Sequence, residues 1–381
     1  MARNDDDRRF MDMALALGWR QQGLTSPNPS VGSVIVRFDG DAPVVVGLGA
    51  TQKGGRPHGE PVALAMAGEA ARGATMYVSL EPCSHHGRAG PCSDAIIAAG
   101  VGRVVTGIED PDSRVAGQGH ARMRAAGLAV DVGVRADEAF RMHRGHILRV
   151  TQGRPLVTLK LARTRDGYAG RRDGRLRITG AAANAQVHLL RAHADAVMVG
   201  AGTVAADDPQ LTVRLPGLGD RSPIRLIIDS GLHTPPEAAA VASAREVPTW
   251  IVTTHAAPAD AERRFSASGV EIMRVDAGPD GRVLLPQAMA LLAQRGVARV
   301  LAEGGPRLAA ALARDDLVDE AILLTGAEEL GPVGDDDGVV ALQPVLAAAL
   351  ADPQRFRPLD GGWWGRGHAR PDRFEIFERP F

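Results

Sequence analysis

Apolar positions at helical spacing alternate with short apolar runs through the first part of the chain. Phe10, Met13, Ala14 and Leu17 recur every three or four positions and predict a helix over residues 8–22. Runs rich in β-branched residues separate further helical segments, and the turn Asp39-Gly40-Asp41 predicts that the first two strands pair antiparallel. The expected helices cover residues 61–72, 91–99, 115–127 and 136–149, and the expected strands cover residues 31–36, 44–48, 75–80, 103–108 and 129–133.

A second series of strands and helices follows the segment 151–155, the best candidate for a linker. Such an alternation predicts an α/β fold, a sheet covered by helices, in each half. We therefore expect two domains, residues 1–150 and 155–381; the tail 357–381 has no readable pattern. The expected strands of the second domain cover residues 156–161, 196–199, 224–228, 249–252 and 297–301, and its helices cover residues 181–193, 286–294 and 307–313.

Composition narrows the class of protein. A length of 381 residues suits two domains, and 44 basic against 45 acidic residues give no electrostatic reason to expect a nucleic-acid or membrane partner. The apolar runs are too short to span a bilayer, and the N-terminal residues lack the apolar stretch of a secretory signal. We expect a cytoplasmic protein that acts on a small molecule.

One histidine, two cysteines and one glutamate form a pattern typical of metal chemistry. His58-Gly59-Glu60 precedes a predicted strand, and Cys83 and Cys92 follow it with eight residues between them. A zinc ion that activates water takes three protein ligands, which one imidazole and two thiolates supply, and keeps a fourth position open. A glutamate that is not a ligand can carry the proton. This order is that of zinc nucleobase deaminases; a buried histidine with two structural thiols is the alternative.

The stretches around these residues resemble the bifunctional deaminase/reductase family of riboflavin biosynthesis. They are Ser26-Pro27-Asn28-Pro29-Ser30-Val31-Gly32, Pro57-His58-Gly59-Glu60, and Glu81-Pro82-Cys83-Ser84-His85-His86-Gly87-Arg88. The resemblance implies a cytidine-deaminase-like α/β/α zinc domain in the first half. It assigns His58, Cys83 and Cys92 to zinc, Glu60 to proton transfer, Asn28 to the pyrimidine ring, and His85, His86 and Arg88 to the phosphoribosyl side of the substrate. It also places the segment Asp110-Pro111-Asp112, with Val115, Gly117 and Gly119, over this site.

The second half resembles the reductase part of the same family. No Rossmann fingerprint follows its first strand, but Glu303-Gly304-Gly305 joins a predicted strand to a predicted helix and could approach a phosphate. The matching stretches are Leu159-Lys160-Leu161-Ala162, Ile178-Thr179-Gly180 and residues 202–214. The resemblance implies a dihydrofolate-reductase-like α/β fold with NADPH. It assigns Ala162, Arg177, Thr203, Asp207, Ser230, Gly305, Pro306 and Arg307 to the cofactor, and Arg175, Arg191, Leu211, Arg214 and Glu303 to the substrate. Asp207 would also handle a proton.

The family resemblance implies two consecutive reactions on one chain. Zinc-dependent deamination would convert a 2,5-diamino-6-(5-phosphoribosylamino)pyrimidin-4-one to the uracil, and NADPH would then reduce its ribosyl group to ribityl. The resemblance also implies a homo-oligomer. Because Arg175-Leu176-Arg177 stands where the family has Ser-x-Trp, a degenerate reductase half that serves oligomerisation or partner binding is the alternative. A nucleic-acid deaminase is disfavoured by the near-neutral charge and the 4% of aromatic residues. His143 and His146 are interpreted as surface histidines.

Overall fold

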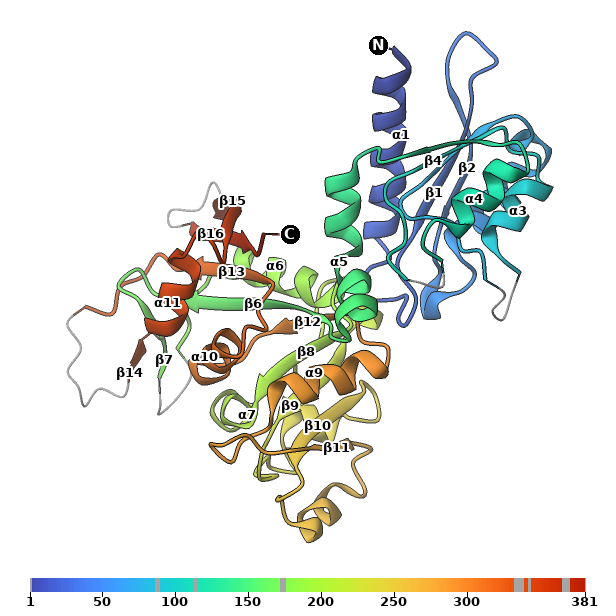
Figure 1. Cartoon of the computed structure of the whole chain (residues 1–381). Helices are drawn as coiled ribbons and strands as arrows, with labels where there is room; N and C mark the ends of the chain where they lie inside the picture. The colour runs from blue at the N-terminus through green and yellow to red at the C-terminus, as the bar shows by residue number, and fades with distance from the viewer. Residues whose placement is uncertain are drawn as a thin grey trace. The chain divides into compact units, whose positions relative to one another are not determined.

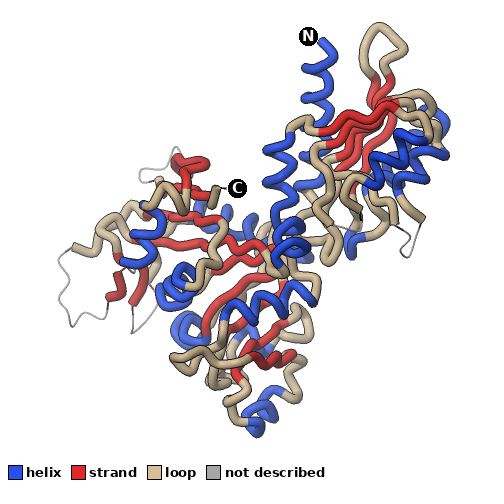
Figure 2. Tube along the Cα trace, in the orientation of Figure 1, coloured by secondary structure: helices blue, strands red, loops and turns tan. Residues whose placement is uncertain are grey.

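The computed structural model describes residues 2–85, 90–112, 115–171, 176–331, 339–341, 344–364 and 371–380. The chain divides into two compact units: residues 1–154 with 295–298, and residues 155–294 with 299–381. Figure 1 labels the elements in chain order, and Figure 2 separates helices from strands by colour. Among the described residues, no helix is long and apolar enough to cross a lipid bilayer.

The first unit is built on a five-stranded sheet in the order β2-β1-β3-β4-β5. The pairing of β1 (Gly32–Arg37) with β2 (Val44–Ala50) is antiparallel, which confirms the prediction. Next to them, β3 (Thr75–Val78) is antiparallel to β1, and β4 (Arg103–Thr106) and β5 (Ala129–Val132) run parallel to β3.

Helices cover both faces of this sheet, as Figure 1 shows. Successive strand residues point to opposite faces, so Ile35 belongs to one buried cluster while Val34 and Val36 belong to the other. The first cluster includes Ala63, Ile96 and Met123, and the second includes Phe10 and Met142, among others. The helices are α1 (Ala2–Trp19), α2 (Gly59–Ala67), α3 (Cys92–Ala98), α4 (Gln118–Ala125) and α5 (Ala136–Gln152), with short 3-10 turns at Lys53–Gly55 and Gly68–Ala71.

Glycines let α2 lie directly on the backbone of β2. A Cβ atom added at Gly49 would lie 2.1 Å from the carbonyl oxygen of Gly59, and one at Gly47 would lie 2.4 Å from that of Ala63. Gly59 is itself in close contact, because its added Cβ would lie 2.7 Å from the carbonyl oxygen of Val31. The start of α2, with His58 before it, is therefore fixed against the sheet by backbone contacts.

The second unit contains a nine-stranded sheet in the order β11-β10-β9-β8-β12-β6-β13-β16-β15. The first seven strands in this order are parallel to their neighbours, and the last two pair antiparallel at one edge. The strands are β6 (Leu156–Arg163), β8 (Ala196–Gly200), β9 (Ile224–Ile228), β10 (Thr249–Thr254), β11 (Glu271–Val275), β12 (Arg299–Ala302), β13 (Glu320–Thr325), β15 (Arg357–Trp364) and β16 (Asp372–Glu378), with a separate pair β7 (Tyr168–Arg171) and β14 (Val339–Ala341).

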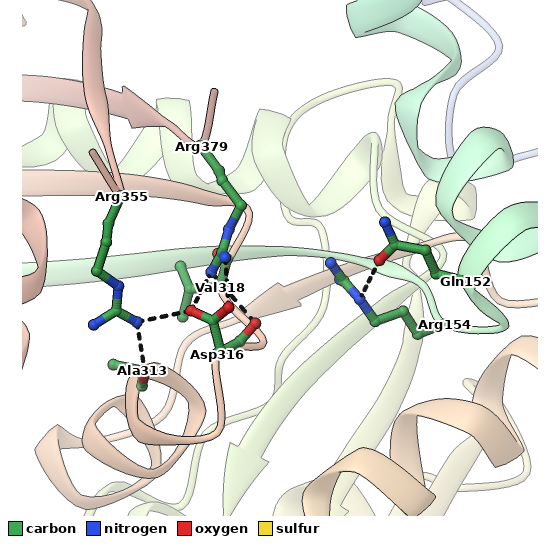
Figure 3. A network of polar contacts seen from close by, with 7 residues as sticks. All are labelled: Gln152, Arg154, Ala313, Asp316, Val318, Arg355 and Arg379. Carbon is green, nitrogen blue, oxygen red and sulfur yellow. Dashed lines mark hydrogen bonds and ion pairs between the residues drawn. The ribbon is translucent and has the colours of Figure 1, made fainter. Parts of the chain in front are cut away.

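The helices of the second unit connect these strands. They are α6 (Ala181–Ala192), α7 (Ala201–Asp207), α8 (Ala239–Ala242), α9 (Leu285–Gln294), α10 (Pro306–Arg314) and α11 (Pro344–Ala351), with 3-10 turns at Gly219–Arg221 and Ala259–Phe265. In the first unit, α5 continues to Gln152, into the segment predicted as a linker. Beyond it, Arg154 Nε donates a hydrogen bond to Gln152 Oε1 at 3.1 Å (Figure 3).

Two segments of the tail, β15 and β16, form the antiparallel edge of the second sheet. Trp364 stacks on Phe374 with ring centroids 4.5 Å apart, and the Asp372 carboxylate accepts a hydrogen bond from Gly180 N at 2.8 Å, just before α6 begins. In the same unit, Asp316 accepts hydrogen bonds from Arg355 and Arg379, as Figure 3 shows, and Arg379 in particular lowers the pKa of Asp316 to about 2. Polar contacts thus secure the tail where its apolar pattern is weak.

The contact between α2 and β2 predicts a specific sensitivity. Gly49→Ala should lower the free energy of unfolding by about 1–3 kcal/mol, because an added methyl group must push α2 away from β2. Urea denaturation of the full chain measures this change. Gly40→Ala is the matched control, since the nearest atom to its added Cβ is 4.0 Å away. Equal stability of the two variants would contradict the role assigned to this contact.

Candidate functional sites

Three side chains from three segments of the first unit converge on one point. His58 immediately precedes α2, Cys83 lies in the loop after β3, and Cys92 is the first residue of α3. His58 Nδ1 lies 3.3 Å from Cys92 Sγ and 3.8 Å from Cys83 Sγ, and the three ligand atoms lie within 4.8 Å of one another. Ligands of a tetrahedral zinc ion are separated by about 3.6 Å when its bonds have their usual lengths. Both thiols are free, so this donor set fits zinc.

The N-terminus of α3 holds Cys83 in place. Cys92 N donates to Cys83 Sγ at 3.3 Å, and Ser93 donates to the Cys83 carbonyl oxygen through its backbone N and its hydroxyl at 3.2 and 3.1 Å. The hydrogen bond from the Cys92 thiol, helped by His58 and by Cys92 N, lowers the pKa of Cys83 to about 4. Cys83 is therefore the sulfur that ionises more readily, whereas the hydrogen bond of Cys92 to Cys83, together with burial, raises the pKa of the Cys92 thiol.

Glu60 and Asn28 lie beside the candidate metal ligands. Glu60 is the second residue of α2 and is 3% exposed, and its Oε2 atom has no hydrogen-bond partner among the residues that the structure describes. Burial, with the nearby Cys83 sulfur, raises the pKa of Glu60 to about 7. Asn28 Nδ2 donates to the Gly55 carbonyl oxygen at 2.8 Å and lies 3.5 Å from His58 Nε2. With a pKa of about 7, the Glu60 carboxyl can accept and release a proton near neutral pH.

Glu81, Glu109 and His120 form a second group with metal-ligating atoms close together. The Glu81 carboxylate, however, accepts hydrogen bonds from three backbone N–H groups: Asp110 at 3.2 Å, Gly117 at 2.9 Å and His120 at 3.1 Å. Both Glu81 oxygens are used in these bonds, so Glu81 holds the backbone at Asp110, Gly117 and His120 in place. Of the other residues assigned to the deaminase, His85 is exposed, while His86 and Arg88 lie outside the described residues.

In the second unit, residues assigned to the cofactor lie at one edge of the sheet. Thr203 follows β8, Ser230 follows β9, and Gly305 follows β12. These three strands are parallel, so their carboxyl ends meet at the edge where α/β sheets bind ligands. Gly305 N donates to Thr203 Oγ1 at 3.2 Å, which joins the starts of α7 and α10, and Val283 N donates to Ser230 Oγ at 3.0 Å.

A largely buried ionic cluster is formed by Lys160 in β6, Arg191 in α6 and Glu303 directly after β12. Arg191 binds Glu303 through two hydrogen bonds, Nε to Oε1 at 2.6 Å and Nη2 to Oε2 at 3.0 Å, and its Nη1 donates to the Thr212 carbonyl oxygen at 3.0 Å. Burial lowers the pKa of Lys160, an effect that Glu303 partly offsets. Burial alone would raise the pKa of Glu303, but Arg191 and Lys160 lower it below its usual value. The Glu303 carboxylate is therefore charged.

Lys160 was not among the predicted site residues. The signal that could have identified it is its sequence context, because it is one of two lysines in the chain and interrupts the apolar strand Leu159-Lys160-Leu161. A lysine in a buried strand needs an anionic partner, and Glu303 is that partner.

The remaining reductase residues occupy varied environments. Arg214 is exposed and its Nη1 donates to Thr212 Oγ1 at 3.2 Å. Leu211 is buried and has a φ of 56°, so a ligand would reach its backbone and not its side chain. Asp207 is exposed at the end of α7, and its side chain makes no hydrogen bond to the residues described. Arg177 and Arg307 are exposed, Ala162 and Pro306 are half-buried, and Arg175 lies outside the described residues.

Two family models match the chain. The model described as the cytidine and deoxycytidylate deaminase zinc-binding region matches residues 4–108, and the RibD C-terminal domain matches residues 155–344. These matches confirm the expected cytidine-deaminase-like zinc domain in the first half and the expected domain of the same riboflavin-biosynthesis family in the second half.

Proteins of known sequence or structure resemble the whole chain. The riboflavin biosynthesis protein RibD of Escherichia coli (strain K12) is 40% identical over 365 residues, which are 92% of this chain and 95% of that protein. RibD of Aquifex aeolicus (strain VF5) is 38% identical over 326 residues, 85% of this chain and 88% of that one.

Solved structures agree with these sequence matches. Acinetobacter baumannii RibD, form 1, superposes with a TM-score of 0.83 at 31% identity, covering 99% of this chain and 100% of that one. The diaminohydroxyphosphoribosylaminopyrimidine deaminase/5-amino-6-(5-phosphoribosylamino)uracil reductase of Thermotoga maritima gives 0.82 at 28% identity with the same coverage. The chain therefore belongs to the RibD family of bifunctional deaminase/reductases of riboflavin biosynthesis.

Proposed function

We propose that the first unit deaminates the diamino-phosphoribosylamino-pyrimidinone and that the second unit reduces the ribosyl group of the resulting uracil. The observation that carries the first assignment is the convergence of His58, Cys83 and Cys92 beside the buried, unpartnered oxygen of Glu60. Similarity along both halves of the chain does not favour a degenerate reductase. The homo-oligomer stays a prediction from the resemblance, and the cytoplasmic location stays a prediction from the N-terminal residues.

In the deaminase, His58, Cys83 and Cys92 would hold zinc, which as a Lewis acid makes a water molecule nucleophilic at neutral pH. The water oxygen adds to the ring carbon that carries the amino group, and ammonia leaves. Glu60 takes one proton from the attacking water and gives it to the ring nitrogen, and it then carries the remaining hydroxyl proton to the departing amino group. This role suits a carboxyl with a pKa of about 7. Asn28, beside His58, would hold the pyrimidine ring.

In the reductase, NADPH supplies hydride to C1 of the ribosyl group, and opening of the sugar leaves the ring oxygen as a hydroxyl. Thr203, Ser230 and Gly305 would hold the cofactor at the carboxyl edge of the sheet, together with Ala162, Arg177, Pro306 and Arg307. Arg191 is committed to Glu303 and Thr212, so it would orient Glu303 toward the substrate. The exposed guanidinium of Arg214 suits the substrate phosphate, and Asp207 would handle a proton.

The metal assignment predicts about one zinc ion per chain. Cys83→Ser should lose that zinc, because one of three ligands is gone and a hydroxyl is a poor replacement for a thiolate. Elemental analysis of dialysed protein measures the ratio. Ser84→Ala is the matched control, since its hydroxyl oxygen has no hydrogen bond among the described residues. A stable wild-type chain that binds no zinc would remove the metal site.

Glu60→Gln should retain zinc but reduce ammonia release at least about a hundredfold, because the amide cannot transfer the proton. A coupled assay for ammonia, run beside elemental analysis, separates loss of chemistry from loss of metal. Turnover close to that of the wild type would exclude Glu60 from proton transfer.

The wild-type chain should oxidise NADPH when given the deaminated intermediate. Glu303→Gln should lower kcat/KM of this reaction about tenfold or more, because Arg191 and Lys160 lose their charged partner. NADPH absorbance measures the rate, and Glu237→Gln, at an exposed position, is the control. Absence of NADPH oxidation in the wild type would revive the degenerate-reductase alternative.

A further inference from the structure

Two histidines of α5 are buried, and the interpretation of them as surface histidines is wrong. His143 and His146 are 2% and 9% exposed. His143 Nε2 lies 3.1 Å from Ser79 Oγ, and His146 Nε2 lies 3.1 Å from Asp110 Oδ1. The other ring nitrogen of His146, Nδ1, is buried without a hydrogen bond among the described residues. A carboxylate only accepts, so His146 Nε2–H donates to Asp110.

Asp110 begins the segment that the family resemblance places over the deaminase site. Its Oδ1 atom also accepts a hydrogen bond from Asp112 N at 2.9 Å. The Asp112 carbonyl oxygen in turn accepts from Val115 N at 2.7 Å and from Ala116 N at 2.9 Å. One carboxylate oxygen therefore connects α5 to the backbone turn that leads into α4.

The same segment lies against the residues that flank both cysteines. A Cβ atom added at Gly119 would lie 2.1 Å from the carbonyl oxygen of Pro82, one residue before Cys83. Arg122 forms an ion pair with Asp94 at 2.6 Å, two residues after Cys92. A shift of this segment would thus change the surroundings of the candidate metal site without breaking its ligand contacts.

We propose that His146 is a positioning residue of the deaminase, which fixes the Asp110–Asp112 turn through the Asp110 carboxylate; this rests on the deaminase function proposed above. Glu81 holds the backbone of the segment from the side of β3, and His146 holds the Asp110 side chain from the side of α5. Without the Nε2–H donor, the buried Asp110 carboxylate loses a charge-assisted hydrogen bond, and the Asp110–Asp112 turn is no longer held in its position. Substrate binding then weakens, while proton transfer through Glu60 is unaffected.

Steady-state deaminase kinetics of the full-length, zinc-loaded chain test this role. His146→Leu should raise KM about tenfold, the order expected for loss of a hydrogen bond to a charged group, with kcat within about twofold. His146→Gln should restore KM, because its amide N–H can replace Nε2–H. Zinc content and NADPH oxidation by the second unit should stay at wild-type values and report intact folding. His143→Gln, on the same helix but in contact with Ser79, should leave the deaminase KM unchanged.

A double-mutant cycle then shows whether His146 acts through Asp110. Adding His146→Leu to an Asp110→Ala chain should change KM no further, because the acceptor is already absent. An additional increase in that background, or a wild-type KM in His146→Leu alone, overturns the inference while the deaminase function stands. A parallel loss of zinc, or a kcat effect without a KM effect, also overturns it. An inactive wild-type deaminase overturns the proposed function and this inference together.

Discussion

Backbone contact between α2 and β2 is the constraint on which the first site depends. Gly47, Gly49 and Gly59 remove the side chains that would otherwise separate a helix from a sheet. The helix start, and with it His58 and Glu60, is consequently set by main-chain geometry and not by flexible side chains. Hydrogen bonds to α3 fix Cys83 in the same way. Cys92 N donates to its sulfur, and the backbone N and the hydroxyl of Ser93 donate to its carbonyl oxygen. Glu60 Oε2 lies at the start of this fixed helix, buried and without a hydrogen bond among the described residues.

The two units use a buried glutamate in opposite ways. The charge of His58 only partly offsets the effect of burial on Glu60, so the pKa of Glu60 rises to about 7 and it can exist in either protonation state. The Glu303 side chain, 8% exposed, is bound by Arg191 and faces Lys160, so it stays ionised. The first environment suits a group that must exchange a proton during the reaction. The second suits a fixed negative charge that orders its neighbours.

Local patterns predicted most elements of the first unit and the residues that converge on the metal site. His58, Glu60, Cys83 and Cys92 could be found because their chemistry requires those residue types in that order. The antiparallel edge β15–β16 could not, because β15 is largely exposed and contains Gly361 and Gly362, so its stability comes from pairing with residues far away in sequence. His146 and Lys160 were missed for the same reason: their partners, Asp110 and Glu303, are distant in the chain.

The hydrogen bond from Gly180 N to Asp372 has a consequence for biosynthesis of the chain. All strands of the first sheet are made by residue 132, whereas α6, which carries Arg191, is anchored by Asp372, 192 residues beyond Gly180. The edge strands of the second sheet, β15 and β16, are also made after all its other strands. During translation the first sheet can therefore form while α6 still lacks its anchor, and a chain that stopped before Asp372 would keep all strands of the first sheet but lack strand β16 of the second.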